Sequence, residues 1–285
     1  MPDRALERAY ADCLAIARSH YENFPVASWL LPRALRRPVA VIYAFARQAD
    51  DIADEGDLSP EARLALLAEF DGMLDGIAAG APQTTSLGLA LADVVGRHRL
   101  PVGLFRDLLS AFRQDVTRKR YADFGEVMDY CRRSANPIGR LLLQLLGRTD
   151  ARDLACSDAV CSALQLINFY QDLGQDYAEN GRIYIPQDEM ERCGVDESHF
   201  RERRTDLGMQ RLMHGQYERA FRLLRAGAPL AQCLPGRFGL ELRLTVLGGR
   251  RILELLDRNR ADAFARPRLA GADRAKIVWQ ALRRR

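Results

Sequence analysis

The chain has 285 residues, of which 48% are hydrophobic, 28% charged and 8% aromatic. This composition excludes a disordered or fibrous chain, and the length suffices to bury a core without disulfides or structural metals. The net charge of +4 is too small to indicate a nucleic-acid-binding protein. The six cysteines form no C-x-x-C pair, so we expect reduced thiols and a cytoplasmic protein.

The basic residues are unusual in type and in position. Only Lys119 and Lys276 of the 42 basic residues are lysines, a bias that we attribute to codon usage. The C-terminal tail, residues 266–285, holds seven basic residues and one acidic residue. We expect a frayed, solvated end, and the alternative is peripheral contact with the anionic inner surface of a membrane. No signal peptide and no membrane-spanning segment is expected.

Apolar residues recur with helical spacing along the whole chain, and strand patterns are nearly absent. The predicted helices, which end at glycine or proline interruptions, span residues 3–19, 35–55, 60–79, 85–99, 102–118, 123–147, 150–178, 204–227, 237–258 and 272–283. Residues 180–186 form a short extended stretch. Because no linker or repeat is visible, we expect a single all-α domain over residues 1–285, with helices packed around a central space.

Two acidic residues share one face of the second predicted helix. Asp50 and Asp54 are four residues apart, with Arg47 one turn before them and Tyr43 one turn earlier. Carboxylates near a helix C-terminus oppose the helix dipole and repel one another, and a divalent cation would offset this cost. Oxygen ligands at this spacing suit Mg²⁺, which also takes water and substrate phosphate as ligands. A solvated acidic helix end is the alternative for this motif alone.

A second polar stripe lies on the helix predicted over residues 150–178. Gln165, Asn168, Asp172 and Asp176 are separated by three, four and four residues, between apolar neighbours. Such side chains need hydrogen bonds, water or an ion, and a helix with one wet side would also satisfy them. The two stripes together predict a cluster of Mg²⁺ ions that binds a diphosphate and assists its ionisation.

These motifs resemble those of the squalene/phytoene synthase family. The resemblance covers residues 10–260 and rests on Asp50-x-x-x-Asp54, on the Asn168, Asp172 and Asp176 stripe, and on Gly181-Arg-Ile-Tyr-Ile-Pro186. It implies an isoprenoid synthase (class I terpenoid synthase) fold with a central cavity, three Mg²⁺ ions and long prenyl diphosphate substrates. The family pattern also includes Tyr130, on a helix that lines the cavity.

Within the family, residues 22–28 and 132–139 are similar to the hydroxysqualene synthases of bacterial hopanoid biosynthesis. This similarity implies a carbon–oxygen lyase that ionises presqualene diphosphate and captures the rearranged cation with water, without NADPH. Its neighbours in the pathway would be a presqualene diphosphate synthase and a flavin-dependent reductase.

The sequence departs from the relatives that condense two prenyl diphosphates. Residues 21–23 replace a Ser-x-Ser-like pair, and Gln171 replaces an arginine. A condensing prenyltransferase that makes presqualene diphosphate, squalene or phytoene is nevertheless the first alternative. A non-catalytic helical assembly factor is the second, although both aspartate motifs are intact.

The resemblance and the residue chemistry together give an expected site. The expected Mg²⁺ ligands are Asp50, Asp54, Asn168, Asp172 and Asp176. The expected substrate contacts are Tyr43, Arg47, Gln165 and Arg182, and for the two arginines the alternative is a salt bridge to neighbouring acids.

Three further residues complete the expected site. Tyr130 is expected to act in catalysis by stabilising the carbocation with its ring, and core packing is its alternative role. Asn23 and Asn136 are candidates for positioning the attacking water, and helix capping is the alternative for each.

Overall fold

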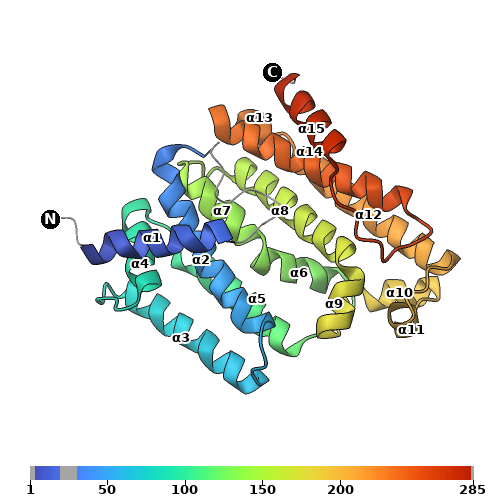
Figure 1. Cartoon of the computed structure of the whole chain (residues 1–285), viewed down its shortest axis with the longest axis horizontal. Coiled ribbons are helices and arrows are strands. Elements are labelled where there is room, and N and C mark those ends of the chain that lie inside the picture. The colour runs from blue at the N-terminus through green and yellow to red at the C-terminus, as the bar shows by residue number, and fades with distance from the viewer. Residues whose placement is uncertain (1–3, 20–30, 284–285) are drawn as a thin grey trace. The chain divides into compact units, whose positions relative to one another are not determined.

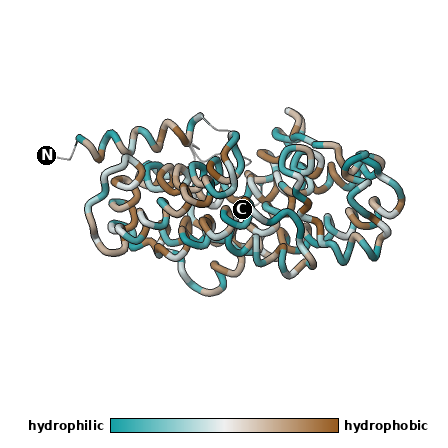
Figure 2. The backbone as a smooth tube through the Cα atoms, turned by 90° about the horizontal axis from the view of Figure 1, so that it is seen from below, coloured by the Kyte–Doolittle hydropathy of each residue, from teal (hydrophilic) through white to brown (hydrophobic). Residues whose placement is uncertain are grey.

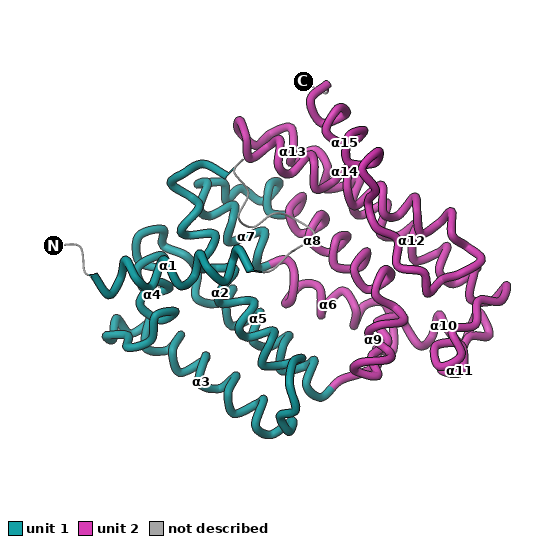
Figure 3. Tube along the Cα trace, in the orientation of Figure 1, with its two compact units in different colours: residues 1–117, 137–154 teal, residues 118–136, 155–285 magenta. Residues whose placement is uncertain are grey.

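The structure, a computed structural model, describes residues 4–19 and 31–283. In these ranges the regular elements are helices and no strand occurs (Figure 1), which confirms the all-α prediction. The chain divides into two compact units (Figure 3). Unit 1 comprises residues 1–117 and 137–154, and unit 2 comprises residues 118–136 and 155–285. That the whole chain forms one domain stays a prediction.

Unit 1 is a bundle in which one helix is central. Its helices are α1 (Arg4–Ser19), α2 (Arg33–Asp54), α3 (Pro60–Ala78), α4 (Ser86–His98), α5 (Val102–Thr117) and, from residue 137, α7 (Asn136–Leu145). Helix α2 packs against α1, α3, α4 and α5. Ser59 caps the start of α3, because its hydroxyl accepts a hydrogen bond from the backbone N–H of Ala62.

The apolar side of α2 forms the core of unit 1. Val41 and Ile42 are buried there, and the Phe45 ring packs edge-on against Phe105 with the ring centroids 5.0 Å apart. Along individual helices, hydrophobic residues are interspersed with hydrophilic ones (Figure 2). The polar residues of the first aspartate motif therefore lie on the remaining side of a firmly packed helix.

Unit 2 contains the long helices α8, α12 and α14 and several short ones. Its helices are α6 (Phe124–Ser134), α8 (Ala151–Gln171) from residue 155, α9 (Leu173–Asn180), α10 (Gln187–Cys193), α11 (Glu197–Arg201), α12 (Leu207–Gly227), α13 (Leu230–Cys233), α14 (Gly236–Arg258) and α15 (Gly271–Arg283). Helix α14 packs against α12, α13 and α15. The short helices α10, α11 and α13 were not predicted.

Two predicted helices are each interrupted. The helix predicted over 123–147 ends as α6 at Ser134 and restarts as α7 at Asn136, because Pro137 lacks a backbone N–H and restricts the residue before it. The helix predicted over 150–178 is interrupted at Asp172, whose φ and ψ are −97° and 12°. Hydrogen bonds from Asp172 N–H to Asn168 and from Asp176 N–H to Asp172 continue through this interruption, so the polar stripe is preserved.

The C-terminal tail is not frayed, and that prediction is wrong for residues 266–283. Helix α15 packs on α14 through Leu247, Ile277 and Ala281. Arg251 on α14 donates to Asp273 on α15 with an Nε to Oδ1 distance of 2.7 Å. The tail is basic in sequence, but apolar packing and this ion pair order it.

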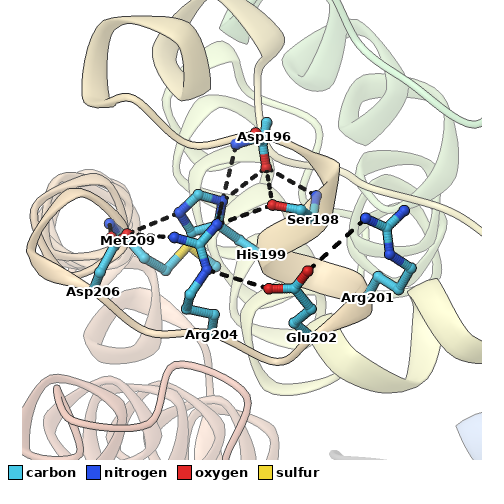
Figure 4. A network of polar contacts seen from close by, with 8 residues as sticks. All are labelled: Asp196, Ser198, His199, Arg201, Glu202, Arg204, Asp206 and Met209. Atoms are coloured by element: carbon cyan, nitrogen blue, oxygen red, sulfur yellow. Dashed lines mark hydrogen bonds and ion pairs between the residues drawn. The ribbon is translucent and has the colours of Figure 1, made fainter.

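A polar network joins α11 to α12 (Figure 4). The Asp196 side chain caps α11 by accepting from Ser198 N–H, and the Asp206 side chain caps α12 by accepting from Met209 N–H. The buried His199 ring lies between them, with Nδ1 and Nε2 each 3.0 Å from an aspartate oxygen. The network satisfies two helix N-termini and a buried imidazole at once.

The remaining general predictions concern thiols and membrane spans. All six cysteines are free in the structure, and that they are reduced thiols stays a prediction. Among the described helices, none has the length and apolar character needed to cross a membrane.

Candidate functional site

The first aspartate motif occupies the last turns of α2 in unit 1. Ala49 and Ala53 are buried against the rest of the unit, whereas 40% of the Asp50 side chain is exposed. Asp54 is half-buried, as is Tyr43 two turns before Asp50. The packed alanines thus fix the helix, and the predicted carboxylates lie beside them on its polar side.

Arg47 is surrounded by the carboxylates of this motif. Its Nη2 atom lies 2.5 Å from Asp51 Oδ1 and also contacts Glu55, and its Nη1 atom lies 3.8 Å from Asp50 Oδ2. The salt-bridge alternative is therefore what the structure shows for Arg47. Its Nε atom is buried and has no hydrogen-bond partner among the described residues, so one donor of the guanidinium remains to be satisfied.

Negative charge is crowded around Asp50. Desolvation of its carboxyl group is the largest cause that raises the pKa of Asp50 to about 8, although part of the side chain is exposed. The charge of Asp54 and that of Asp115 on α5 raise it further, and Arg47 opposes them. A divalent cation would relieve this repulsion.

Asp115 is a residue that the sequence analysis missed. It is 4% exposed, and it follows the buried Phe112 by three residues and the buried Leu108 by seven. These spacings place it on the apolar face of its helix. An acidic residue at a core position is rare without a partner, and this was the signal that could have identified it.

The second aspartate motif lies on α8 and α9 in unit 2. The four predicted residues are all half-buried: Gln165, Asn168, Asp172 and Asp176. Their neighbours Leu166, Ile167 and Leu173 are buried. The predicted polar stripe on an apolar helix is therefore present.

Basic residues of the C-terminal tail accompany Asp172. Arg266 forms an ion pair with Asp172, and Gln171 Nε2 donates to the Pro267 carbonyl at 2.9 Å. Burial raises the pKa of Asp172, against the positive charges of Arg266 and Arg268. The sequence analysis missed Arg266 and Arg268 as site residues, because no local pattern links positions so far apart in the sequence.

Arg182 is held directly after α9. Its backbone N–H donates to the Asp176 carbonyl at 3.0 Å, and its buried guanidinium donates through Nη1 to the Tyr184 hydroxyl at 3.4 Å. Gly181 before it has a φ of 62°, a left-handed conformation that favours glycine. The backbone thus ties Arg182 to the end of the second motif.

Tyr130 belongs to a buried cluster of aromatic rings. Phe169 and Tyr184 stack with their centroids 3.7 Å apart, and the Tyr130 ring lies 5.5 Å from Tyr184 and 5.9 Å from Phe169. Tyr121 completes the cluster. Phe169 follows Asn168 directly, so the rings adjoin the second motif. This arrangement is compatible with both roles predicted for Tyr130.

The two candidate asparagines have different outcomes. Asn136 is buried at the start of α7, and its Oδ1 accepts from the Ser162 hydroxyl at 2.9 Å. This oxygen therefore has a structural partner on α8. Asn23 lies outside the described residues.

The donor chemistry of both motifs fits magnesium. No group of three or more His, Cys, Asp or Glu side chains in the described part of the chain forms a ready-made metal site. Magnesium needs few protein ligands, since one or two carboxylates with water and phosphate oxygens complete its shell. The crowded carboxylates at Asp50 and the desolvated Asp172 are suitable oxygen donors.

Comparison with known proteins gives the family. Residues 17–279 match the squalene/phytoene synthase family. The chain is similar to the hydroxysqualene synthase of Rhodopseudomonas palustris, with 37% identity over 82% of this chain and 79% of that protein. It is also similar to the hydroxysqualene synthase of Sinorhizobium fredii, with 34% identity over 79% of this chain and 75% of that protein.

Solved structures agree with this match. The squalene synthase HpnC from Alicyclobacillus acidocaldarius has a TM-score of 0.83 and 36% identity, and the match covers 90% of this chain and 96% of that one. A dehydrosqualene synthase in complex with ligand has a TM-score of 0.87 at 22% identity, over 99% of this chain and 98% of that one, and bears on the fold alone. The chain is an all-α enzyme with the isoprenoid synthase fold and belongs to the squalene/phytoene synthase family.

Proposed function

We propose that this enzyme is a hydroxysqualene synthase. Its reaction would be the magnesium-dependent ionisation of presqualene diphosphate and the capture of the rearranged carbocation by water, which yields hydroxysqualene and diphosphate. The similarity to two proteins named hydroxysqualene synthase supports this choice over other activities of the family.

The main structural support for this proposal is the hydrogen bond that Gln171 makes. Condensing relatives are expected to have an arginine at this position, which would help to hold a second diphosphate. Here the Gln171 amide donates to the Pro267 carbonyl at 2.9 Å and carries no positive charge. A site that lacks this cation suits a substrate with a single diphosphate.

The chain's own residues account for diphosphate binding. The Mg²⁺ ligands would be Asp50, Asp54, Asn168, Asp172 and Asp176. The bound ions would supply positive charge that neutralises the leaving diphosphate. Arg182, Arg266 and Arg47 would donate hydrogen bonds to its oxygens, since guanidinium groups match phosphate geometry. Arg47 would exchange its contact with Glu55 for a phosphate oxygen. Its Nε, which has no hydrogen-bond partner within the described part of the chain, would favour this exchange.

The aromatic cluster would act on the hydrocarbon part of the reaction. When the carbon–oxygen bond breaks, its electron pair leaves with the diphosphate and a cyclopropylcarbinyl cation remains. The faces of Tyr130, Phe169 and Tyr184 would stabilise this cation without reacting with it. Water then adds to the rearranged cation and loses one proton, which gives the alcohol.

Product analysis tests the proposal. Purified protein with Mg²⁺ and presqualene diphosphate should give hydroxysqualene without NADPH, and the new hydroxyl should carry ¹⁸O when the reaction runs in ¹⁸O-water. Squalene that forms only when NADPH is added would contradict water capture. Farnesyl diphosphate alone should give no product, and a C30 product from it would support the condensing alternative instead. An absence of turnover with either substrate would support the assembly factor.

A further inference from the structure

Helix α15 presents a second apolar stripe, on the side away from α14. Helix α15 lies next to α14 (Figure 1). Its buried side chains, Ile277 and Ala281, pack with Leu247 of α14. Val278, Trp279 and Leu282 are 48%, 53% and 61% exposed. They are half of the exposed large apolar side chains in the described residues. A water-facing surface normally does not concentrate such residues in a single helix.

The spacing of this stripe is that of an amphipathic helix. Ala275, Val278, Trp279 and Leu282 occupy positions i, i+3, i+4 and i+7, and all four are exposed. This is the pattern by which a helix buries one face. Since the other face of α15 already packs on α14, the outer stripe is prepared for a partner outside unit 2.

Positive charge flanks the stripe. Arg274, Lys276 and Arg283 are exposed on α15, and the sequence continues with two more arginines. Asp273 is the single acidic residue of the tail and is paired with Arg251. An apolar stripe with tryptophan at its centre and cations on its flanks is typical of a helix that lies in a membrane interface.

A cavity next to the stripe adds a place for an anionic group. It has a volume of about 230 Å³ and is lined by Leu247, Arg250, Trp279, Gln280 and Arg283. The Arg283 guanidinium lies 3.9 Å from the centre of the Trp279 ring. Arg250 in this recess donates to Gln280 at 3.0 Å and pairs with Glu254, so Arg283 beside the indole is the cation that would meet a lipid phosphate.

We propose that the outer face of α15 docks on an anionic phospholipid surface, with Trp279 and Leu282 inserted at the interface and the flanking cations facing the headgroups. The charge complementarity argues for a lipid surface rather than a second copy of the chain, because two copies would bring these cations together. The proposal rests on α15 and its neighbours alone and is independent of the reaction that the enzyme catalyses.

Tryptophan fluorescence gives the first test, because the chain has only two tryptophans. In the full-length Trp29→Phe variant, Trp279 is the remaining reporter. Its emission should shift to shorter wavelength with phosphatidylglycerol vesicles and should not shift with phosphatidylcholine vesicles. Raising the salt from about 0.1 M to about 0.5 M should reverse the shift. An unchanged emission with phosphatidylglycerol vesicles overturns the proposal.

Vesicle sedimentation with matched variants gives the second test. Leu282→Ser should weaken binding to phosphatidylglycerol vesicles by about tenfold, since a leucine leaves the interface. Arg274→Gln should weaken it by about fivefold. The controls are Leu207→Ser and Arg222→Gln, at exposed positions of α12, and both should bind like the wild type.

Two outcomes contradict the proposal. The first is an equal loss of binding in the α15 variants and the α12 controls. The second is a change of oligomeric state in Leu282→Ser, by light scattering, with unchanged vesicle binding, which would assign the stripe to a second copy. Melting temperatures near that of the wild type confirm that these exposed substitutions leave the fold intact.

Discussion

Three carboxylates contact a single arginine at the end of α2. Asp50, Asp51 and Glu55 all pair with Arg47, and Asp54 adds a further negative charge beside Asp50. The single positive charge of Arg47 cannot neutralise all of these carboxylates, so negative charge remains in excess around Arg47. In the proposed function, magnesium supplies the missing positive charge. Asp50 and Asp54 would bind the metal, whereas Asp51 and Glu55 pair with Arg47.

Removing one proposed ligand from either motif should strongly reduce turnover. We expect Asp54→Asn and Asp176→Asn each to lower kcat/KM for presqualene diphosphate by about 100-fold or more, because each loses an anionic ligand at the leaving group. Steady-state product formation at saturating Mg²⁺ measures this loss. The matched control is Asp57→Asn, an exposed carboxylate just after α2, which should stay within about threefold of the wild type. Full turnover in either ligand variant would refute the metal assignment.

Part of the candidate site could be predicted from the sequence and part could not. Asp50 and Asp176 could be predicted because acidic residues at helical spacing are conspicuous among apolar neighbours. Asp115 sits in an apolar stripe, where a single polar residue gives a weak signal. Arg266 reaches Asp172 from a distant segment, and only the tertiary structure brings them together.

At the scale of the elements, backbone contacts decide how the helices of unit 2 pack. Gly227 ends α12 where that helix meets α8. A Cβ atom at this position would lie 2.4 Å from the Cys156 carbonyl oxygen and 2.9 Å from the Val160 backbone nitrogen. The backbone of α8 cannot yield as a flexible side chain can, so glycine is required by the close approach.

Two glycine substitutions on α12 should therefore have opposite effects. Gly227→Ala should lower the free energy of unfolding by about 2–3 kcal/mol because it overpacks the contact with α8. Gly215→Ala should raise it by about 1 kcal/mol, since no atom other than the nearby backbone of α12 itself lies within 4 Å of the added Cβ. Urea unfolding followed by circular dichroism measures both. Equal changes in the two variants would show that the contact between α8 and α12 does not limit stability.

The cap of α11 should make stability depend on pH. Hydrogen bonds from the Ser198 side chain, and then from His199, hold the pKa of Asp196 well below its usual range. A carboxyl group whose pKa is lowered by folding stabilises the protein above the pKa of the unfolded chain, about 4, and loses that contribution as the pH falls further. The wild type should therefore be more stable than Asp196→Asn above about pH 5, and this difference in the free energy of unfolding should disappear between about pH 5 and pH 2.

The urea midpoint of the two proteins across this pH range checks the expectation. The Asn side chain can still accept the capping hydrogen bond but carries no charge, so only the ionic part of the cap is removed. A difference in midpoint that stays constant with pH would contradict a role for the Asp196 charge.

The sequence predicted the long helices closely and the interruptions poorly. The predicted range of α3, residues 60–79, agrees with the observed Pro60–Ala78, because the Ser59 cap and the proline that follows it mark the start of the helix. The interruption at Asp172 leaves the hydrogen-bond pattern and the polar stripe intact, so periodicity does not register it. Helix α13 is too short for its period to be measured.

At the scale of the whole molecule, the two motifs belong to different compact units. Asp50 and Asp54 are carried by unit 1, and Asp172 and Asp176 by unit 2. Our proposal assigns both motifs to one diphosphate, so binding of this ligand would need the motif of each unit. Stabilisation by the ligand is then expected to fail when either unit loses its motif.

Thermal unfolding with inorganic diphosphate tests, without any turnover, whether ligand binding needs both motifs. Mg²⁺ and diphosphate together should raise the melting temperature, and saturation at about 100 times the dissociation constant corresponds to about 2.7 kcal/mol. Either component alone should have a much smaller effect, because the carboxylates repel diphosphate unless the cation lies between them. Asp54→Asn and Asp176→Asn should each remove the joint effect, and Asp57→Asn should retain it. If only one of the two variants removes it, a single motif binds the metal and the diphosphate, and the assignment of one ligand to both units is wrong.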